Sequence, residues 1–233
     1  MARNKRTIQE TQRGIQKRNP RPVFLIVSNA KETETAYFES LQKTYDKIII
    51  KPKKKPKHTD DYYPLVEETI QLAKREADGI ESDFHVWCVF DADVDYNTPG
   101  NEHAKAKKLT NATALAKDNN INVALSTPCF ELWLLLHFTY TAKKMPNPKV
   151  AEAKLMKAAD LQEYKKDLSG GLLDKLSDKI EVAINHANRL KNHQVANTGK
   201  TNLLNVSINP YTNVWEILEA IQTQNASNAV SIC

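Results

Sequence analysis

Short apolar runs alternate along the first half of the chain with longer amphipathic segments. A continuous apolar run of about five residues is typical of a strand buried on both faces of a sheet. Such runs predict strands at 23–27, 47–51, 84–90 and 121–125. Between them, apolar positions at helical spacing predict helices at 35–44, 60–78, 102–119 and 129–138. Strands that alternate with helices predict an α/β fold, with a mostly parallel sheet flanked by helices.

The strand pattern stops after residue 146. The segments 150–166 and 172–192 are predicted to be helices, and in the second of them apolar residues recur every three or four positions, which is typical of a packing face. A polar loop is expected at 192–205 and a last helix up to residue 220. We therefore expect a basic flexible arm at 1–22, an α/β core at 23–145, a C-terminal helical extension at 146–222 packed on the core, and a flexible tail at 223–233.

Composition narrows the class of protein. Hydrophobic residues make up 41% of the chain and charged residues 26%, a balance that is ordinary for a soluble domain. No apolar stretch approaches the ~20 residues that a membrane span needs, and the chain does not open with a secretory signal. The three cysteines lie far apart without a CxxC pair, which argues against a disulfide framework and a structural zinc site. We expect a cytoplasmic protein without membrane contact.

The net charge of +5 is distributed unevenly. Basic side chains dominate residues 1–22, and the segment 51–58 contains five lysines and no acid: Lys51, Lys53, Lys54, Lys55 and Lys57. The rest of the chain is acidic on balance. Local basic patches attract polyanions because they neutralise phosphates and release counterions. The lysine run is therefore a candidate nucleic-acid contact, and a solvated loop is the alternative.

Acidic residues follow the third predicted strand. Asp91, Asp93 and Asp95 come directly after the apolar run 84–90, and polar residues 28–34 follow the first run. The carboxyl ends of parallel strands share one edge of the sheet, where the functional crevice of such folds lies. Carboxylates two residues apart on a strand point to the same side and repel each other unless a cation lies between them. We expect Asp91 and Asp93 to bind Mg²⁺ or Mn²⁺, with a solvated turn as the alternative. Asp95 is either a third ligand or a loop acid.

Four segments carry a resemblance to a known family. They are FLIVSNAKETETAYF at 24–38, VWCVFDAD at 86–93, STPCFELWLLLHF at 126–138 and NPYTNVW at 209–215. In this order and spacing they resemble the RloB-like proteins, a bacterial family related to Toprim nucleases. The resemblance spans roughly residues 22–220, and PCFELWLLLHF is its most specific part. It implies a Toprim-like fold, a role in anti-phage defence or abortive infection, cleavage of DNA or RNA, and a partner ATPase encoded by a neighbouring gene.

The resemblance also implies roles for individual residues. Asn29 and Ala30 stand where relatives carry a Glu-Gly pair, and Asn cannot accept a proton near neutral pH. Glu34 matches the family's second acid and is a candidate metal ligand. Glu131 is a candidate catalytic residue or second-metal ligand, with a helix-start acid as the alternative, whereas His137 is expected to be a core histidine.

Two functions follow from these assignments. One is a metal-dependent nuclease whose site is weakened at Asn29. The other is a degenerate Toprim module that binds nucleic acid or a partner ATPase without cutting. A homo-oligomer is possible, and the sequence does not decide the oligomeric state.

Overall fold

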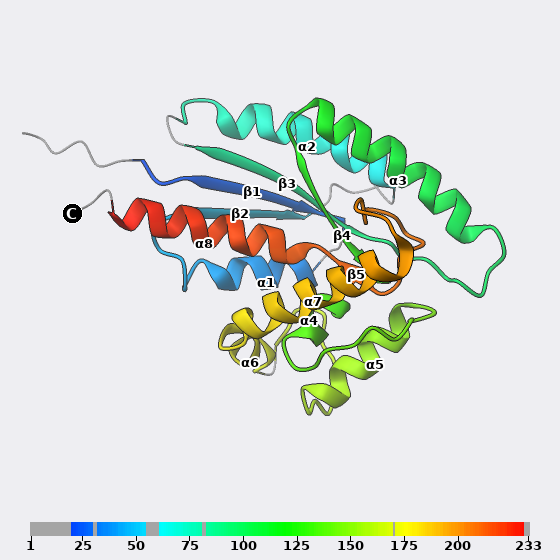
Figure 1. Cartoon of the computed structure of the whole chain (residues 1–233). Coiled ribbons are helices and arrows are strands. Elements are labelled where there is room, and N and C mark those ends of the chain that lie inside the picture. Colours follow the sequence, from blue (N-terminus) through cyan, green and yellow to red (C-terminus); the bar gives the residue numbers. More distant parts are fainter. Residues whose placement is uncertain (1–19, 30–31, 55–60, 81–82, 170, 231–233) are drawn as a thin grey trace, which may run out of the picture.

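A five-stranded sheet forms the centre of the molecule (Figure 1). The computed structural model describes residues 20–29, 32–54, 61–80, 83–169 and 171–230. The strands lie in the order β2-β1-β3-β4-β5, and all neighbours are parallel except β4 and β5. Their bounds are β1 Val23–Ser28, β2 Ile49–Lys54, β3 Phe84–Asp91, β4 Asn122–Thr127 and β5 Tyr211–Thr212. The predicted α/β class with a mostly parallel sheet is confirmed.

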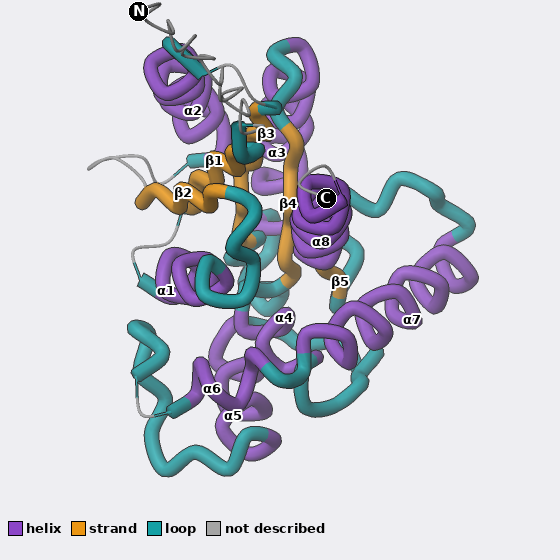
Figure 2. The backbone as a smooth tube through the Cα atoms, turned by 90° about the vertical axis from the view of Figure 1, so that its left-hand side faces the viewer, coloured by secondary structure: helices purple, strands orange, loops and turns teal. Residues whose placement is uncertain are grey.

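Helices cover both faces of this sheet. Figures 1 and 2 show two helices on one face, α2 (Tyr62–Ala77) and α3 (Asn101–Asp118), and two on the other, α1 (Thr33–Leu41) and α8 (Val214–Val230). Each face has its own cluster of buried apolar side chains. Strand β1 lies between the two clusters, which is why every residue of its sequence VFLIVS is buried.

The helical extension lies on the side of the sheet that α1 and α8 cover (Figures 1 and 2). It contains α5 (Pro148–Ala158), α6 (Leu172–Ser177) and α7 (Ile180–Thr198), whose buried apolar side chains belong to the same cluster as those of α1 and α8. The helix α4 (Glu131–Leu136), from the predicted core, lies together with them in Figure 1. All six residues of α4 are buried, and their apolar side chains belong to the same cluster as those of α1 and α8. The extension therefore shares the core of the sheet and does not build a separate one.

Two predicted helices have different bounds in the structure. The helix predicted at 150–166 ends at Ala158, and Asp160 takes a left-handed φ of 52° that stops it. The helix predicted at 172–192 is divided into α6 and α7, and α7 continues to Thr198 through part of the expected polar loop. Gly199 ends it with a φ of 65°, a conformation that glycine adopts without strain. Residues 159–169 form an irregular connection.

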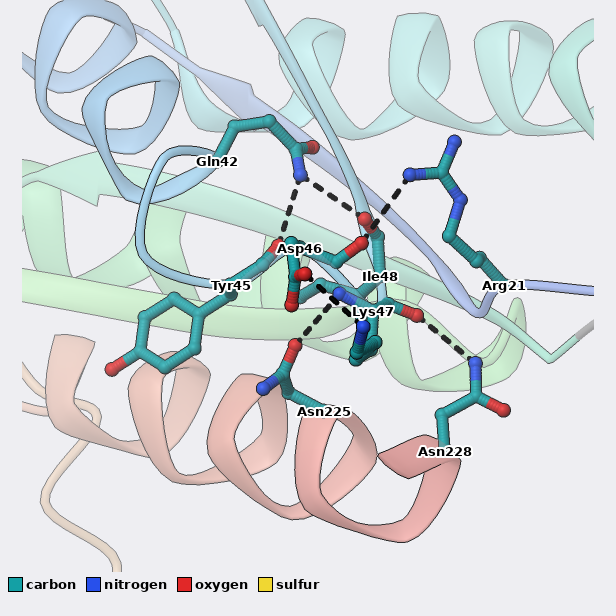
Figure 3. A network of polar contacts seen from close by, with 8 residues as sticks. All are labelled: Arg21, Gln42, Tyr45, Asp46, Lys47, Ile48, Asn225 and Asn228. Atoms are coloured by element: carbon teal, nitrogen blue, oxygen red, sulfur yellow. Dashed lines mark hydrogen bonds and ion pairs between the residues drawn. The ribbon is translucent and has the colours of Figure 1, made fainter. Parts of the chain in front are cut away.

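The last helix is longer than expected and contacts the opposite end of the sheet. The flexible tail was expected to start at residue 223, but α8 continues to Val230. The Asn225 side chain accepts a hydrogen bond from the Lys47 amide at 3.0 Å, and the Asn228 side chain donates to the Lys47 carbonyl at 3.0 Å (Figure 3). Gln42 donates to the carbonyls of Tyr45 and Ile48 in the same network. Polar residues near the end of the chain therefore fix the segment that leads into β2.

Two further predictions concern membrane-spanning helices and the basic N-terminal arm. In the described part of the chain, no helix has the length and apolar character that crossing a membrane requires. Most of the expected basic arm, residues 1–19, lies outside the described residues.

Candidate metal site

The candidate site lies where β1, β3 and β4 end. Ser28 is level with Val89 in the neighbouring strand, and Asp91 is level with Ser126. The chain that leaves β3 is fixed to β4, because the Ala92 amide donates to the Ser126 carbonyl at 2.9 Å and the Asp93 amide donates to the Pro128 carbonyl at 3.0 Å. The loop that carries the aspartates is therefore held against the start of the family-specific 128–138 segment.

Asn29 lies directly beside Asp91, as the parallel sheet predicts. Its amide donates to the Val89 carbonyl at 3.2 Å, which extends the pairing of β1 with β3 by one residue. Its side-chain oxygen accepts a hydrogen bond from the Asp91 amide at 3.2 Å. The side-chain oxygen of Asn29 therefore holds the backbone of Asp91. Ala30 lies outside the described residues.

Asp91 and Asp93 differ in their surroundings. Asp91 is the last residue of β3 and is partly buried, whereas Asp93 is exposed and has a φ of 46°. Asp is among the few non-glycine residues that adopt this left-handed conformation readily. The two carboxylates are thus presented by a strand end and a turn, and the alternation expected along one continuous strand stops at Asp91.

Asp95 has local partners. Its carboxylate accepts hydrogen bonds from the Asn97 amide at 3.0 Å and from the Thr98 hydroxyl at 3.2 Å. Both bonds stay within one turn of the loop, in the arrangement by which Asp side chains stabilise turns. This geometry favours the loop-acid interpretation over a third ligand.

Two glutamates complete an acidic cluster, which we define as Glu34, Asp91, Asp93 and Glu131. Glu34 lies in the first turn of α1 and is fully buried, and Glu131 begins α4 with 5% of its surface exposed. No donor among the described residues reaches either carboxylate oxygen of Glu34 or the Oδ1 atom of Asp91. Burial of these oxygens without a donor within hydrogen-bonding distance disfavours the charged form of both carboxyl groups.

The pKa values of these acids follow from that environment. Burial raises the pKa of Glu34 to about 8, and the charges of Glu131 and Asp93 contribute to the rise. Burial also raises the pKa of Asp91, with further contributions from Glu34, Asp93 and Glu131. Glu131 and Asp93 are therefore close enough to Glu34 and Asp91 to disfavour ionisation of these two acids. A proton or a cation must relieve this repulsion.

Two residues at the cluster were not predicted from the sequence. The Tyr164 hydroxyl donates to Glu131 Oε1 at 2.8 Å and lies 3.4 Å from the Thr33 hydroxyl. Partial burial of Lys166 opposes its charged form, but Glu131, Glu152 and Asp91 together raise the pKa of this lysine. Both residues belong to the irregular segment 159–169, most of which was predicted to be helical, so no spacing in the sequence pointed to them.

The donor set fits Mg²⁺ or Mn²⁺. Buried carboxylate oxygens without donors are suited to a hard cation, and Mg²⁺ is usually held by one or two carboxylates together with water and phosphate oxygens. In the described ranges, no group of three or more His, Cys, Asp or Glu side chains is arranged to hold a metal ion by itself. A pair of carboxylates from the acidic cluster, with water and a phosphate, is the arrangement that suits these residues.

The predicted lysine contacts lie on the neighbouring edge strand. Lys51 and Lys53 are in β2, and both pair with Glu76 of α2, at 2.8 Å and 3.2 Å. Lys54 ends the strand level with Ser28 and is exposed. Lys55 and Lys57 lie outside the described residues. Of the described lysines in this run, Lys54 is therefore the one nearest to the strand ends that carry the acidic cluster.

His137 is a core histidine, as expected. Its ring is fully buried and makes contacts with the Tyr37 hydroxyl at 3.3 Å and the Trp133 carbonyl at 3.0 Å. Burial lowers its pKa to about 4, so the ring is neutral at physiological pH.

Comparison with known proteins gives one match. The family model described as RloB-like protein matches residues 24–221, a range that includes the whole acidic cluster and the described strands except the first residue of β1. No curated protein and no solved structure matches the chain.

Proposed function

The chain belongs to the RloB-like family, and on that premise we propose that it is a metal-dependent nuclease with a Toprim-like fold. Its substrate is the phosphodiester backbone of DNA or RNA, and its setting is bacterial anti-phage defence with a partner ATPase encoded nearby. One observation supports this proposal above the others: four carboxylates meet at the carboxyl edge of a parallel sheet, and buried oxygens of Glu34 and Asp91 lack hydrogen-bond donors among the described residues.

Each acidic residue has a role in this proposal. The candidate ligands are Glu34, Asp91 and Asp93, and a pair of them would hold Mg²⁺ or Mn²⁺ together with water and the phosphate. The metal would supply charge stabilisation on the phosphate and a water of lowered pKa. Glu131 is kept in one orientation by the Tyr164 hydroxyl at 2.8 Å, and it accepts the proton of the attacking water. The mostly buried surroundings of Glu34 and Glu131 limit competing solvent.

A second candidate function is a binding module without cleavage. It is favoured by the environment of Asn29, whose side-chain oxygen accepts a hydrogen bond from the Asp91 amide. An amide oxygen cannot take up a proton near neutral pH, so this position contributes no general base. In this alternative, the acidic cluster binds a cation and the chain holds nucleic acid or its ATPase partner.

Calorimetric titration with Mg²⁺ and Mn²⁺ tests the metal site. Binding should be measurable for the natural sequence and lost in the Asp91→Ala, Asp93→Ala double variant. Asp95→Ala is the matched control, since Asp95 caps its own loop, and it should retain the affinity. Unchanged affinity in the double variant would remove the acidic cluster as a metal site.

Cleavage assays separate the two candidate functions. Single-stranded DNA, duplex DNA and tRNA should be incubated with each metal, with and without the neighbouring ATPase. Metal-dependent cleavage that the double variant lacks supports the nuclease. Metal binding without cleavage of any substrate supports the binding module.

A further inference from the structure

Two lysines lie over tyrosine rings beside the loop that carries the aspartates. The Lys105 ammonium, on α3, is 5.5 Å from the centre of the Tyr62 ring. The Lys144 ammonium, in the connection between α4 and α5, is 4.9 Å from the centre of the Tyr96 ring. The two lysines come from different elements, yet both are positioned next to residues 91–96.

The tyrosine rings are themselves fixed to that loop. The Tyr62 hydroxyl donates to the carbonyl of Ala92, between the two aspartates, at 2.7 Å. Burial raises the pKa of Tyr62, and the nearby charges of Asp93 and Asp91 add to the rise. Tyr96 lies at the end of the same loop, and its amide donates to the Pro146 carbonyl at 3.2 Å. The lysines are therefore held at defined places relative to the acidic cluster.

The partner of a lysine decides how much of its charge is compensated. Lys108, one turn beyond Lys105, pairs with Asp61 at 2.7 Å, and Lys51 pairs with Glu76 at 2.8 Å. A carboxylate cancels the positive charge that a polyanion would meet. An aromatic ring orients the ammonium group by its quadrupole and leaves its net charge in place. Lys105 and Lys144, whose described partners are tyrosine rings, therefore keep their positive charge next to the loop that carries the aspartates.

We propose that Lys105 and Lys144 bind the phosphate backbone of a nucleic-acid strand and guide it to the acidic cluster. An acidic site repels phosphates, so a strand needs cationic groups on either side of the scissile position. The proposal rests on the proposed function, because it assigns the substrate path of the same site. It places the strand on α3 and the α4–α5 connection, in addition to the exposed Lys54 at the end of β2.

Salt dependence of binding tests this path. A fluorescein-labelled oligonucleotide, single-stranded and as a duplex, should be titrated by anisotropy at several KCl concentrations, with Ca²⁺ in place of Mg²⁺ to limit cleavage. Removal of each phosphate contact should lower the slope of log K against log salt by about 0.7 for the single strand and about 0.9 for the duplex. Lys105→Ala, Lys144→Ala should therefore lower it by about 1.4 to 1.8.

The matched control is Lys107→Ala, Lys143→Ala. It removes two positive charges from the same two elements. Lys107 is exposed and lies two positions after Lys105, and Lys143 is exposed and directly precedes Lys144. Its slope should stay close to that of the natural sequence. Equal loss in both double variants would overturn the proposal, because the attraction would then be diffuse. An unchanged slope in the first variant, or no measurable binding by the natural sequence, would overturn it as well.

The outcomes also distinguish this inference from the proposed nuclease. Selective loss of slope in a protein that never cleaves keeps the lysine path and removes the nuclease. Cleavage with an unchanged slope keeps the nuclease and removes the path. Thermal unfolding of each variant checks folding, and the corresponding Lys→Gln pairs replace any alanine pair that unfolds.

Discussion

The two ends of the sheet differ in whether their polar groups have hydrogen-bond partners. Near the start of β2, the Lys47 amide and carbonyl are paired with Asn225 and Asn228, each at 3.0 Å. At the carboxyl ends of the strands, buried oxygens of Glu34 and Asp91 find no donor among the described residues. The first end uses neutral amides that complete a hydrogen-bond network, and the second concentrates like charges that repel.

This contrast separates stability from function. Satisfied buried amides contribute to the folded state, because a lost partner would leave a backbone group without a hydrogen bond. Uncompensated carboxylates destabilise the folded state until a proton or a cation binds. The uncompensated end of the sheet is the one that carries the acidic cluster, and a bound cation would relieve its repulsion, in line with the proposed metal site.

Of the changes considered, adding a carboxylate at the carboxyl ends of the strands should have the largest effect, on Mg²⁺ affinity and on the rate of cleavage. Asn29→Glu with Ala30→Gly supplies a charged ligand and a base at the position where the resemblance implies a Glu-Gly pair. We expect tighter binding of Mg²⁺ and metal-dependent cleavage faster by on the order of 10²-fold, since a positioned general base contributes about that much or more. Cleavage should be measured at saturating Mg²⁺, with folding checked by circular dichroism.

Asn29→Gln with Ala30→Gly is the matched control for that change. Gln has the length of Glu without its charge, so it should leave metal affinity and cleavage near those of the natural sequence. If the folded Glu variant behaves like the Gln variant, position 29 is not the missing catalytic position. The binding module would then be the better assignment.

Removing a carboxylate from the same end should stabilise the metal-free protein. Folded Glu34 has a pKa of about 8 against 4.5 in the unfolded chain, so between these values the folded state keeps a proton that the unfolded state has lost. Stability therefore falls as pH rises from 4.5 to about 8. Glu34→Gln should flatten this dependence and raise the free energy of unfolding by roughly 5 kcal/mol above pH 8, since each unit of pKa difference corresponds to about 1.4 kcal/mol.

Urea unfolding at several pH values checks this expectation. Glu39→Gln is the control, because Glu39 is exposed on the same helix and should change little. Mg²⁺ should stabilise the natural sequence at high pH and stabilise Glu34→Gln less. A natural protein whose stability is flat across this range would mean that Glu34 is not the uncompensated group that the contrast requires.

Weakening the satisfied end should reduce stability and leave the site intact. Asn225→Ala with Asn228→Ala removes both partners of Lys47, at about 1 kcal/mol for each hydrogen bond. We expect a loss of about 2 kcal/mol in urea unfolding, with unchanged metal affinity, because distant sites act independently. Thr223→Ala is the control, since the Thr223 hydroxyl bonds within its own helix. A change in metal affinity would show that the two ends are coupled.

The strands and their ends could be predicted because their pattern is local. A continuous apolar run such as VFLIVS indicates a strand that is buried on both faces of the sheet. The carboxyl ends of neighbouring parallel strands lie at the same edge of the sheet. Asn29 and Asp91 were therefore expected to lie close together, and a hydrogen bond of 3.2 Å joins them. The turn at Asp93 was not predicted, because Asp adopts both extended and left-handed conformations and its neighbours do not decide between them.

Other features could not be predicted because they depend on contacts between distant residues. Tyr164 reaches Glu131 from an irregular segment whose composition resembles that of the helix before it. The end of α8 was expected to be a tail because its sequence is polar. In the structure, its polar side chains bind backbone groups of Lys47. A hydrogen bond to a backbone group leaves no trace in the sequence of that distant segment.

The hydrogen bonds between α8 and Lys47 join residues that are synthesised at very different times. Residue 47 leaves the ribosome long before residues 225 and 228, which complete its hydrogen bonds. Such long loops close slowly, because their entropy must be overcome before the contact forms. These two hydrogen bonds can therefore form only after most of the chain has been synthesised. A product that ends before residue 225 would leave the Lys47 amide and carbonyl without these partners.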